Sequence, residues 1–359
     1  MADSGDIIRE IRMNPIVPSE SVLVATARSM RPRKAEEPAA RDRRGHVETC
    51  PFCVGNEHMT PPTIAAFPGQ ADWQVRIVEN LYPVLGDDSS ATPLVFGLQQ
   101  AMDGYGRHEV LIDHPKHGVA IHEMSAEHLA LLLGAYRDRM EQLYAGNDRI
   151  RYVLVFKNFG AAAGASIPHT HSQIIAMPVV PENVFNEVAS SRAHYQKHHQ
   201  CIFCSLIDEA LTFEATIYDH TSGEVRRRIS VGQYVIERGE RFIAVKPFAS
   251  RFEWEIHILP LNHEADFLTV TEEDRQDFAR VLRRTMARLD AVIGGAQYNF
   301  FLHSLPRSPD LADCAGSYHW HLEICPRTSI PTGFELGSGL FVNTISPETA
   351  AEQLRAVEL

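Results

Sequence analysis

The chain has 359 residues, a formal net charge of −12, and 44% hydrophobic and 22% charged residues. These values are typical of a soluble globular protein of about two domains, and they exclude disordered, collagen-like and coiled-coil chains. The acidic balance also argues against a nucleic-acid partner, because binding phosphates requires an excess of Lys and Arg.

The start of the chain, residues 1–6, is polar and acidic and contains no basic and apolar leader. We therefore expect a cytoplasmic protein without a secretory signal. The longest aliphatic cluster lies around Leu129 to Leu133, far short of the roughly 18 residues that a membrane span needs. No membrane partner is expected.

In chain order, the first landmark is a Cys-x-x-Cys pair formed by Cys50 and Cys53. The segment HEVLIDHPKH, residues 108–117, follows, and eight residues later a helix is predicted. Its apolar residues recur at spacings of three and four between an N-terminal Ser125 and a C-terminal Gly146. A β-rich run, residues 152–157, leads to the segment His169-Thr170-His171.

Each of these landmarks recurs in the same order 146 to 151 residues later. The second copies are Cys201 with Cys204, residues 254–263 (WEIHILPLNH), a helix from Thr271 to Gly294 with Asp274 in a capping box, residues 298–303, and His319-Trp320-His321. Such a repeat predicts two halves of one architecture. We expect an α+β fold with halves 1–190 and 191–359, each an antiparallel sheet with packed helices.

The repeated Cys and His residues indicate metal sites. Structural zinc commonly takes two thiolates close in sequence and two imidazoles from elsewhere. The repeat selects two sets of four, namely Cys50, Cys53, His117 and His169 in the first half, and Cys201, Cys204, His263 and His319 in the second. His108, His114, His122 and His257 compete with them. A redox pair or two buried thiols would explain each Cys pair alone, but the matching His residues favour zinc.

The two histidines of the first His-Thr-His segment are expected to have different roles. Because they alternate on a short extended segment, we expect their rings to point to opposite sides. His169 would then bind metal while His171 faces a pocket. A neutral imidazole is a competent nucleophile toward phosphorus near pH 7, since its ordinary pKa is about 6.5.

The segment GASIPHTHSQ, residues 164–173, resembles the active-site motif of the galactose-1-phosphate uridylyltransferase family in the histidine-triad superfamily. In that family, Gly-x-Ser-x-Pro-His-x-His-x-Gln carries a nucleophilic His. CPFCVGNEHMTPP, residues 79–83, DHPKH, YHWHLEICPR and residues 333–337 also occur in family order, so the resemblance covers nearly the whole chain. It implies two tandem histidine-triad-like halves.

The resemblance also implies a reaction. His171 would attack the α-phosphorus of a nucleotide sugar, become nucleotidylated and release a hexose 1-phosphate, and a second sugar phosphate would then take the nucleotide. The family activity moves UMP from UDP-glucose to galactose 1-phosphate. It further implies a homodimer and two zinc sites, the second of which holds iron in some relatives.

Site residues follow position by position from the same resemblance. They are Ser166, Asn158 and Gln173 around the phosphates, Asn80 near the nucleoside, Arg28 or Arg31 on phosphate, and Glu335 reaching the hexose from the partner subunit. Plainer roles compete: Arg28 and Arg31 as solvated loop charges, Asn158 as a turn cap, and Glu335 as the partner of a nearby Arg.

Gln173 favours transfer over hydrolysis on physical grounds. Histidine-triad hydrolases hold a third His at this position, which helps when a poor leaving group must be protonated. A sugar phosphate leaves as a stable anion, whereas a Gln amide can donate to the charge that develops on phosphoryl oxygens. The second half has Glu323 at the matching position, which would repel a phosphate, so we expect one active site per chain.

Departures from the family pattern leave the substrates open. Thr170 and Ser172 within HTHSQ resemble the plant ADP-glucose phosphorylase branch, and Ser329, Phe341 and Leu81 replace a Lys, a Gln and an Asp of the uridylyltransferases. The alternatives are therefore an ADP-glucose phosphorylase or adenylyltransferase with phosphate as acceptor, a histidine-triad hydrolase, and a non-catalytic two-zinc scaffold.

Overall fold

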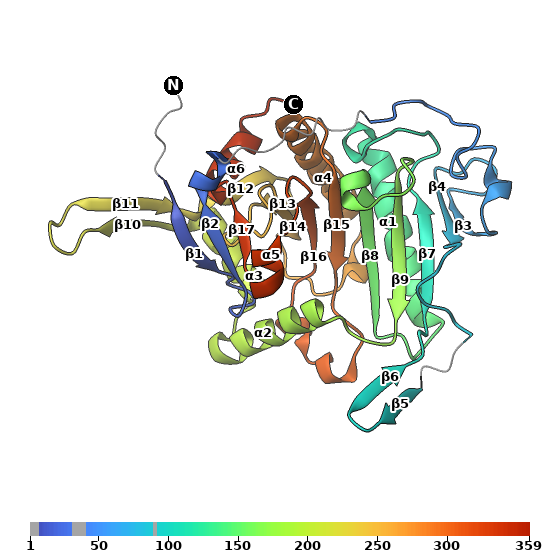
Figure 1. Cartoon of the computed structure of the whole chain (residues 1–359), viewed down its shortest axis with the longest axis horizontal. Coiled ribbons are helices and arrows are strands. Elements are labelled where there is room, and N and C mark those ends of the chain that lie inside the picture. The colour runs from blue at the N-terminus through green and yellow to red at the C-terminus, as the bar shows by residue number, and fades with distance from the viewer. Residues whose placement is uncertain (1–6, 31–40, 89–91) are drawn as a thin grey trace.

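The computed structural model describes residues 7–30, 41–88 and 92–359. Its centre is a ten-stranded sheet in the order β12-β13-β14-β16-β15-β8-β9-β7-β4-β3, shown in Figure 1. Neighbouring strands in this sheet are antiparallel. The strands from the first half are β3 (Thr63–Phe67), β4 (Val75–Glu79), β7 (Arg107–Ile112), β8 (Tyr152–Phe159) and β9 (His171–Met177). Those from the second are β12 (Val235–Arg238), β13 (Phe242–Val245), β14 (Ile256–Pro260), β15 (Tyr298–His303) and β16 (His321–Pro326).

The two halves meet at the middle of this sheet. Strand β8 pairs with β15 from Phe159 opposite Tyr298 to Val155 opposite Leu302. The strand order of one half therefore mirrors that of the other across this junction. The predicted α+β fold with repeated antiparallel halves is confirmed, and the halves share one continuous sheet.

Two long helices follow the predicted boundaries. Helix α1 (Ala126–Ala145) begins after Ser125, whose hydroxyl accepts the His128 amide hydrogen. Helix α4 (Glu272–Ile293) begins with the predicted capping box and ends at Gly294, which has a φ of 76° that favours glycine. Both helix predictions are confirmed.

These helices cover one face of the sheet. Ile174 and Ala176 of β9 are fully buried in the main core, together with Leu129 of α1 and Phe278 of α4. Because side chains alternate along a strand, the intervening positions of β9 lie on the opposite face. We call this opposite face, which contains His171 and Gln173, the open face because α1 and α4 do not cover it. Helices α2 (Glu182–His198) and α3 (Ile202–Thr212) pack against part of it around Tyr152.

Smaller elements surround the sheet. Strands β1 (Arg9–Met13), β2 (Ser21–Ala25) and β17 (Phe341–Asn343) form a three-stranded sheet. Two hairpins project in Figure 1, one formed by β5 (Pro93–Phe96) and β6 (Gln99–Met102), the other by β10 (Glu214–Tyr218) and β11 (Val225–Ser230). The other α-helices among the described residues are α5 (Gly333–Ser338) and α6 (Pro347–Arg355).

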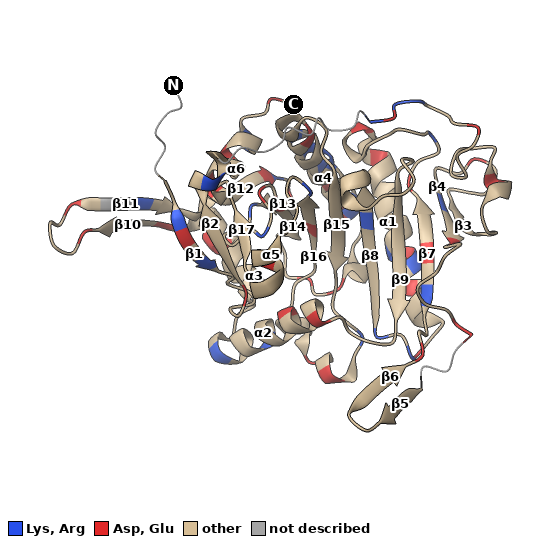
Figure 2. Cartoon of the chain, viewed as in Figure 1, with Lys and Arg blue, Asp and Glu red and all other residues tan. Residues whose placement is uncertain are grey.

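Acidic and basic residues are interspersed along the outer loops and helices, while the central strands are mostly uncharged (Figure 2). Within the described ranges, none of the helices has both the length and the apolar character needed to cross a membrane.

Candidate active site and metal centres

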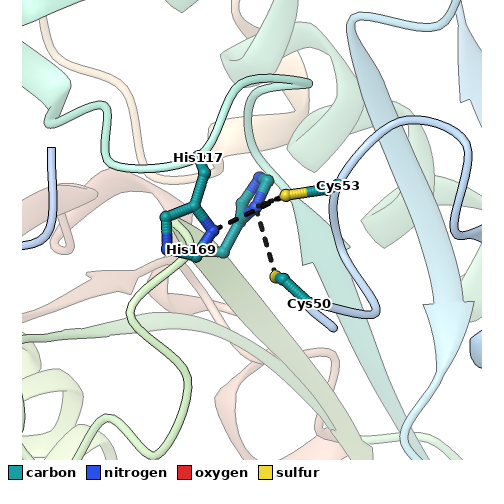
Figure 3. Close-up of side chains that lie close together, drawn as sticks. All are labelled: Cys50, Cys53, His117 and His169. Atoms are coloured by element: carbon teal, nitrogen blue, oxygen red, sulfur yellow. Dashed lines mark hydrogen bonds between the residues drawn. The ribbon is translucent and has the colours of Figure 1, made fainter. Parts of the chain in front are cut away.

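The first predicted metal set comes together beside the start of β9 (Figure 3). Its four ligand atoms lie within 4.8 Å of one another. Cys53 Sγ is 3.6 Å from Nδ1 of both His117 and His169, and Cys50 Sγ is 3.6 Å from His169 Nδ1. Tetrahedral zinc with ordinary Zn–S and Zn–N bonds separates sulfur from nitrogen by about 3.6 Å, so these spacings fit a zinc ion.

The outward nitrogen of His169 is hydrogen-bonded, whereas that of His117 lies near a carboxylate without a hydrogen bond. His169 Nε2–H donates to the His114 carbonyl at 2.7 Å, and His117 Nε2 lies 3.3 Å from Asp42 Oδ2. Metal-bound imidazoles normally make such contacts, which fix the tautomer that presents the other nitrogen. Burial raises the pKa of the Cys50 thiol to about 11, so a cation is required to hold it as a thiolate near neutral pH.

The second predicted set repeats this arrangement. The ligand atoms of Cys201, Cys204, His263 and His319 also lie within 4.8 Å of one another. Cys204 Sγ is 3.3 Å from His263 Nδ1 and 3.7 Å from His319 Nδ1. The Nε2–H groups donate to the carbonyls of Ala315 and Pro260. Both sets could therefore bind a metal ion.

His169 and His171 do not point to opposite sides of their segment, and that expectation is wrong. The ring of Phe52 contacts both imidazoles, with centroid distances of 6.1 Å to His169 and 5.3 Å to His171. Residues at i and i+2 of an extended segment share a face. The two rings have different surroundings. His169 precedes β9 and contacts the His114 carbonyl and the thiols, while His171 is the first residue of the strand.

His171 presents one nitrogen for chemistry. Its Nδ1–H donates to the His169 carbonyl at 2.8 Å, which places the lone pair on Nε2. Within the described part of the chain, no hydrogen bond occupies Nε2, and 8% of the residue remains exposed. Burial lowers the pKa of His171, and nearby Lys157 lowers it further. This lowering favours the neutral form of the ring, which is the form that acts as a nucleophile.

Gln173 is held by a residue that the sequence analysis did not assign to the site. His108 Nδ1 accepts the Val84 amide hydrogen, so its Nε2–H donates to Gln173 Oε1 at 2.8 Å. Asn80 Nδ2 lies 3.1 Å from the same His108 nitrogen. With its oxygen engaged, the Gln173 amide directs its N–H groups elsewhere. Val110 is paired with Gln173, so His108 lies two residues along β7 on the same face of the sheet. Assigning His108 to the site therefore requires knowledge of this strand pairing.

Asn158 lies near the end of β8, and Ser166 lies in the loop that follows this strand. Asn158 is on the open face near the end of β8, and its Oδ1 accepts the Asn299 amide at 2.7 Å. Ser166 is exposed in the loop that joins β8 to β9. That loop begins at Gly160, whose φ of 87° and closeness to the Gln297 side chain exclude a larger residue.

Arg28 and Glu335 lie together in a separate pocket of about 480 Å³. Ala162 from the β8–β9 loop, Arg251 and Arg327 also line it. Glu335 caps α5 by accepting the Thr332 amide and hydroxyl hydrogens; burial opposes ionisation, but these bonds lower the Glu335 pKa. Arg31 lies outside the described residues.

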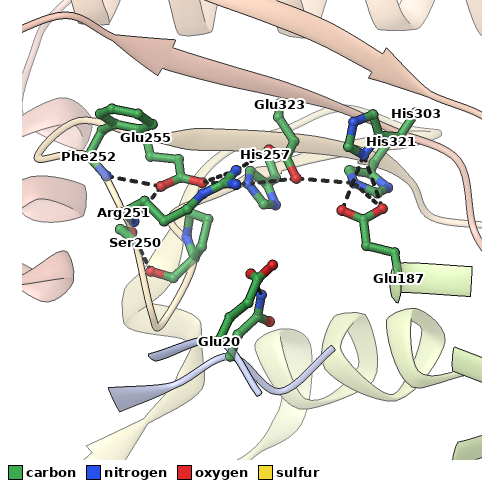
Figure 4. A network of polar contacts seen from close by, with 12 residues as sticks. Glu20, Glu187, Ser250, Arg251, Phe252, Glu255, His257, His303, His321 and Glu323 are labelled. Atoms are coloured by element: carbon green, nitrogen blue, oxygen red, sulfur yellow. Dashed lines mark hydrogen bonds and ion pairs between the residues drawn. The ribbon is translucent and has the colours of Figure 1, made fainter. Parts of the chain in front are cut away.

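The second half has a different polar cluster at the matching position (Figure 4). His321 Nδ1–H donates to the His319 carbonyl, as in the first half. Its strand neighbour Glu323 accepts Arg251 Nη2 at 2.5 Å, and Glu187 faces His303 at 3.0 Å. The ligand atoms of Glu187, His303, His321 and Glu323 also cluster within 4.8 Å, a group that the sequence analysis missed.

Comparison with known proteins identifies the family. Residues 2–181 match the family model described as galactose-1-phosphate uridyl transferase, N-terminal domain. The chain belongs to the galactose-1-phosphate uridylyltransferase family. It is therefore an enzyme of that family, and the predicted resemblance is confirmed.

Members of this family resemble the chain over almost its whole length. An ADP-glucose phosphorylase from Arabidopsis thaliana is 29% identical over 98% of this chain and 93% of that protein. A galactose-1-phosphate uridylyltransferase from Thermotoga maritima is 26% identical over 98% of this chain and 99% of that protein. The crystal structure of the Arabidopsis phosphorylase with bound ADP-glucose superposes with a TM-score of 0.80, at 28% identity over 98% of this chain and all of that one.

Proposed function

We propose that this family member transfers a nucleoside monophosphate from a nucleotide sugar to a phosphate-bearing acceptor through His171. The observation that carries the proposal is the His171 Nε2 atom, which has no hydrogen bond to the described residues, on a ring whose Nδ1–H donates to the His169 carbonyl. A non-catalytic scaffold has no need of a free imidazole beside a Gln and an Asn.

In the first step, His171 Nε2 forms a bond to the α-phosphorus while the bond to the bridging oxygen breaks. The electron pair leaves with the sugar phosphate, which needs little protonation. The charge on the ring is stabilised because Nδ1–H already donates to a carbonyl at 2.8 Å. In the second step, an acceptor phosphate oxygen attacks the same phosphorus and frees His171.

Gln173, Asn158 and Ser166 are proposed to hold the α-phosphoryl oxygens. The Gln173 N–H groups are available because His108 engages only its oxygen. Asn80, which contacts the same His108, extends this surface toward a nucleoside. Donors fixed in place before the reaction stabilise the developing charge without reorganisation.

The two Cys₂His₂ sets are proposed to hold zinc. The ion would supply no reacting group there and would instead cross-link segments far apart in sequence. In the first half, Cys50 and Cys53 are joined to the loop of His117 and to His169, two residues before the nucleophile. The second set joins the start of α3 to the segment before β16.

The first candidate reaction is UMP transfer from UDP-glucose to galactose 1-phosphate. Relatives named for this activity come from bacteria, fungi and animals and span nearly the whole chain. In this proposal, Arg28 and Glu335 belong to the sugar-phosphate pocket, and a second subunit of a homodimer shares it.

The second candidate is phosphorolysis of ADP-glucose with inorganic phosphate. The pocket that contains Glu335 is lined by Ser329 and Phe341, so it lacks the Lys and Gln of the uridylyltransferases. Phe341 instead packs against Phe252 at a centroid distance of 5.6 Å. The Arabidopsis relative named for this activity resembles the chain at 29% identity.

A matrix of donors and acceptors tests both candidates. UDP-glucose and ADP-glucose are each incubated with galactose 1-phosphate or inorganic phosphate, and the products are quantified by chromatography. Uridylyl transfer predicts UDP-galactose, whereas phosphorolysis predicts ADP and glucose 1-phosphate. Steady release of UMP or AMP without an acceptor would show a hydrolase, and no product from either donor would refute both candidates.

A further inference from the structure

A buried lysine lies directly behind the candidate nucleophile. Lys157 belongs to β8, and its side chain is 0% exposed on the sheet face that α1 and α4 cover. It therefore cannot touch a substrate on the open face. Burial lowers the Lys157 pKa, and the charge of Asp113 opposes this shift.

Each of the three ammonium hydrogens of Lys157 has an acceptor. Nζ lies 2.5 Å from Asp113 Oδ2, 2.8 Å from Thr170 Oγ1 and 2.9 Å from the His171 carbonyl oxygen. One side chain of β8 thus connects the end of β7 with the start of β9. Asp113 Oδ2 also accepts the Ser172 hydroxyl at 3.0 Å.

The same segment is held from the β7 side. The Asp113 amide donates to the Thr170 carbonyl at 3.2 Å, and His169 Nε2–H donates to the His114 carbonyl. Because His171 Nδ1–H bonds to the His169 carbonyl, the ring direction depends on the main chain of these three residues. Lys157 donates a hydrogen bond to that main chain at the carbonyl of His171 itself.

Such an arrangement is costly if stability is its only role. Taking an ammonium and a carboxylate out of water is unfavourable, and a well-packed apolar pair is often no less stable. The geometry indicates a second role for Lys157 and Asp113, because their hydrogen bonds all reach one short segment of the chain. Its residues are Thr170, His171 and Ser172.

We propose that Lys157, held by Asp113, is a positioning residue that fixes the His171 main chain and so aims Nε2 at the phosphorus. The inference rests on the proposed nucleotidyl transfer to His171. A displacement of about 1 Å at a reacting atom can cost about 100-fold in rate. Substrate binding is unaffected, because Lys157 lies behind the strand.

Lys157→Met combined with Asp113→Asn tests the proposal without leaving an unpaired buried charge. The readout is the single-turnover rate of nucleotide attachment, measured by intact mass spectrometry per folded molecule, beside the Kd of the nucleotide sugar. We expect the rate to fall about 100-fold with the Kd unchanged. In Lys157→Met alone, the attachment rate should fall by the same factor. This variant should also unfold at a lower temperature, since Asp113 then lacks its lysine partner.

The matched control is Arg139→Met. Arg139 of α1 pairs with Glu109 at 2.5 Å, and Glu109 is buried on the same face of β7 as Asp113. This variant should lower the unfolding temperature and keep the attachment rate. An unchanged rate in the double variant, or an equal loss in Arg139→Met, would overturn the inference. Failure of the unaltered protein to become labelled would instead refute the proposed function.

Discussion

The contact between His108 and Gln173 predicts that two side chains act as one unit in phosphoryl transfer. Gln173→Met keeps the approximate shape of the side chain but removes the amide that is proposed to donate to the phosphoryl oxygens. Loss of one such preorganised donor costs about 10²- to 10³-fold in kcat. His108→Phe removes only the bond that orients the amide, 2.8 Å long, and should cost about 1 kcal/mol, about fivefold in rate.

The double variant distinguishes this arrangement from two independent contributions. Once the Gln173 amide is gone, its orientation no longer matters, so His108→Phe should add nothing in the Gln173→Met background. Initial rates at saturating donor give kcat for all four proteins, and the coupling energy should be about 1 kcal/mol. Ile175→Val, a smaller change opposite His108 in the strand pairing, controls for disturbance of this face. Fully additive losses would refute the reasoning.

Three other outcomes are expected. Metal analysis should give two zinc ions per chain, and Cys201→Ser should lose one ion and lower the unfolding temperature while leaving the other bound; a full complement in that variant would contradict the ligand set. Burial lowers the pKa of Lys246 to about 7, although the charge of Glu255 opposes this shift. Between pH 7 and pH 10 the unfolded chain therefore binds more protons than the folded chain. The free energy of unfolding should rise with pH over this range by about 1.4 kcal/mol per pH unit. Lys246→Met should remove this slope in denaturant titrations, and an unchanged slope would refute the assignment. Trp320→Ala, at a fully buried position, should cost about 3–5 kcal/mol of unfolding free energy, and a loss under 1 kcal/mol would contradict the core packing.

Local signals were sufficient to predict the long helices. The Thr271–Asp274 capping box and the stop at Gly294 are encoded within a few residues, and the structure has both. The metal sets could be predicted because the repeat supplies its own alignment: His117 and His263 were selected by matched position, and each lies beside its Cys pair.

Contacts between distant strands could not be predicted from the sequence in the same way. The joining of β8 to β15 depends on pairing between the halves, which composition and periodicity do not encode. His108 contacts Gln173 from 65 residues away, and Asp113 contacts Lys157 from 44. The expectation for His169 and His171 failed because positions two apart share a face of an extended segment.

The most direct test of the account is to locate the nucleotide on the protein after brief exposure to UDP-glucose or ADP-glucose without acceptor. The account predicts a mass gain of one nucleoside monophosphate, mapped by peptide fragmentation to His171 and lost on addition of acceptor. Attachment to His169, His321 or another residue, or labelling that persists in His171→Ala, would contradict it.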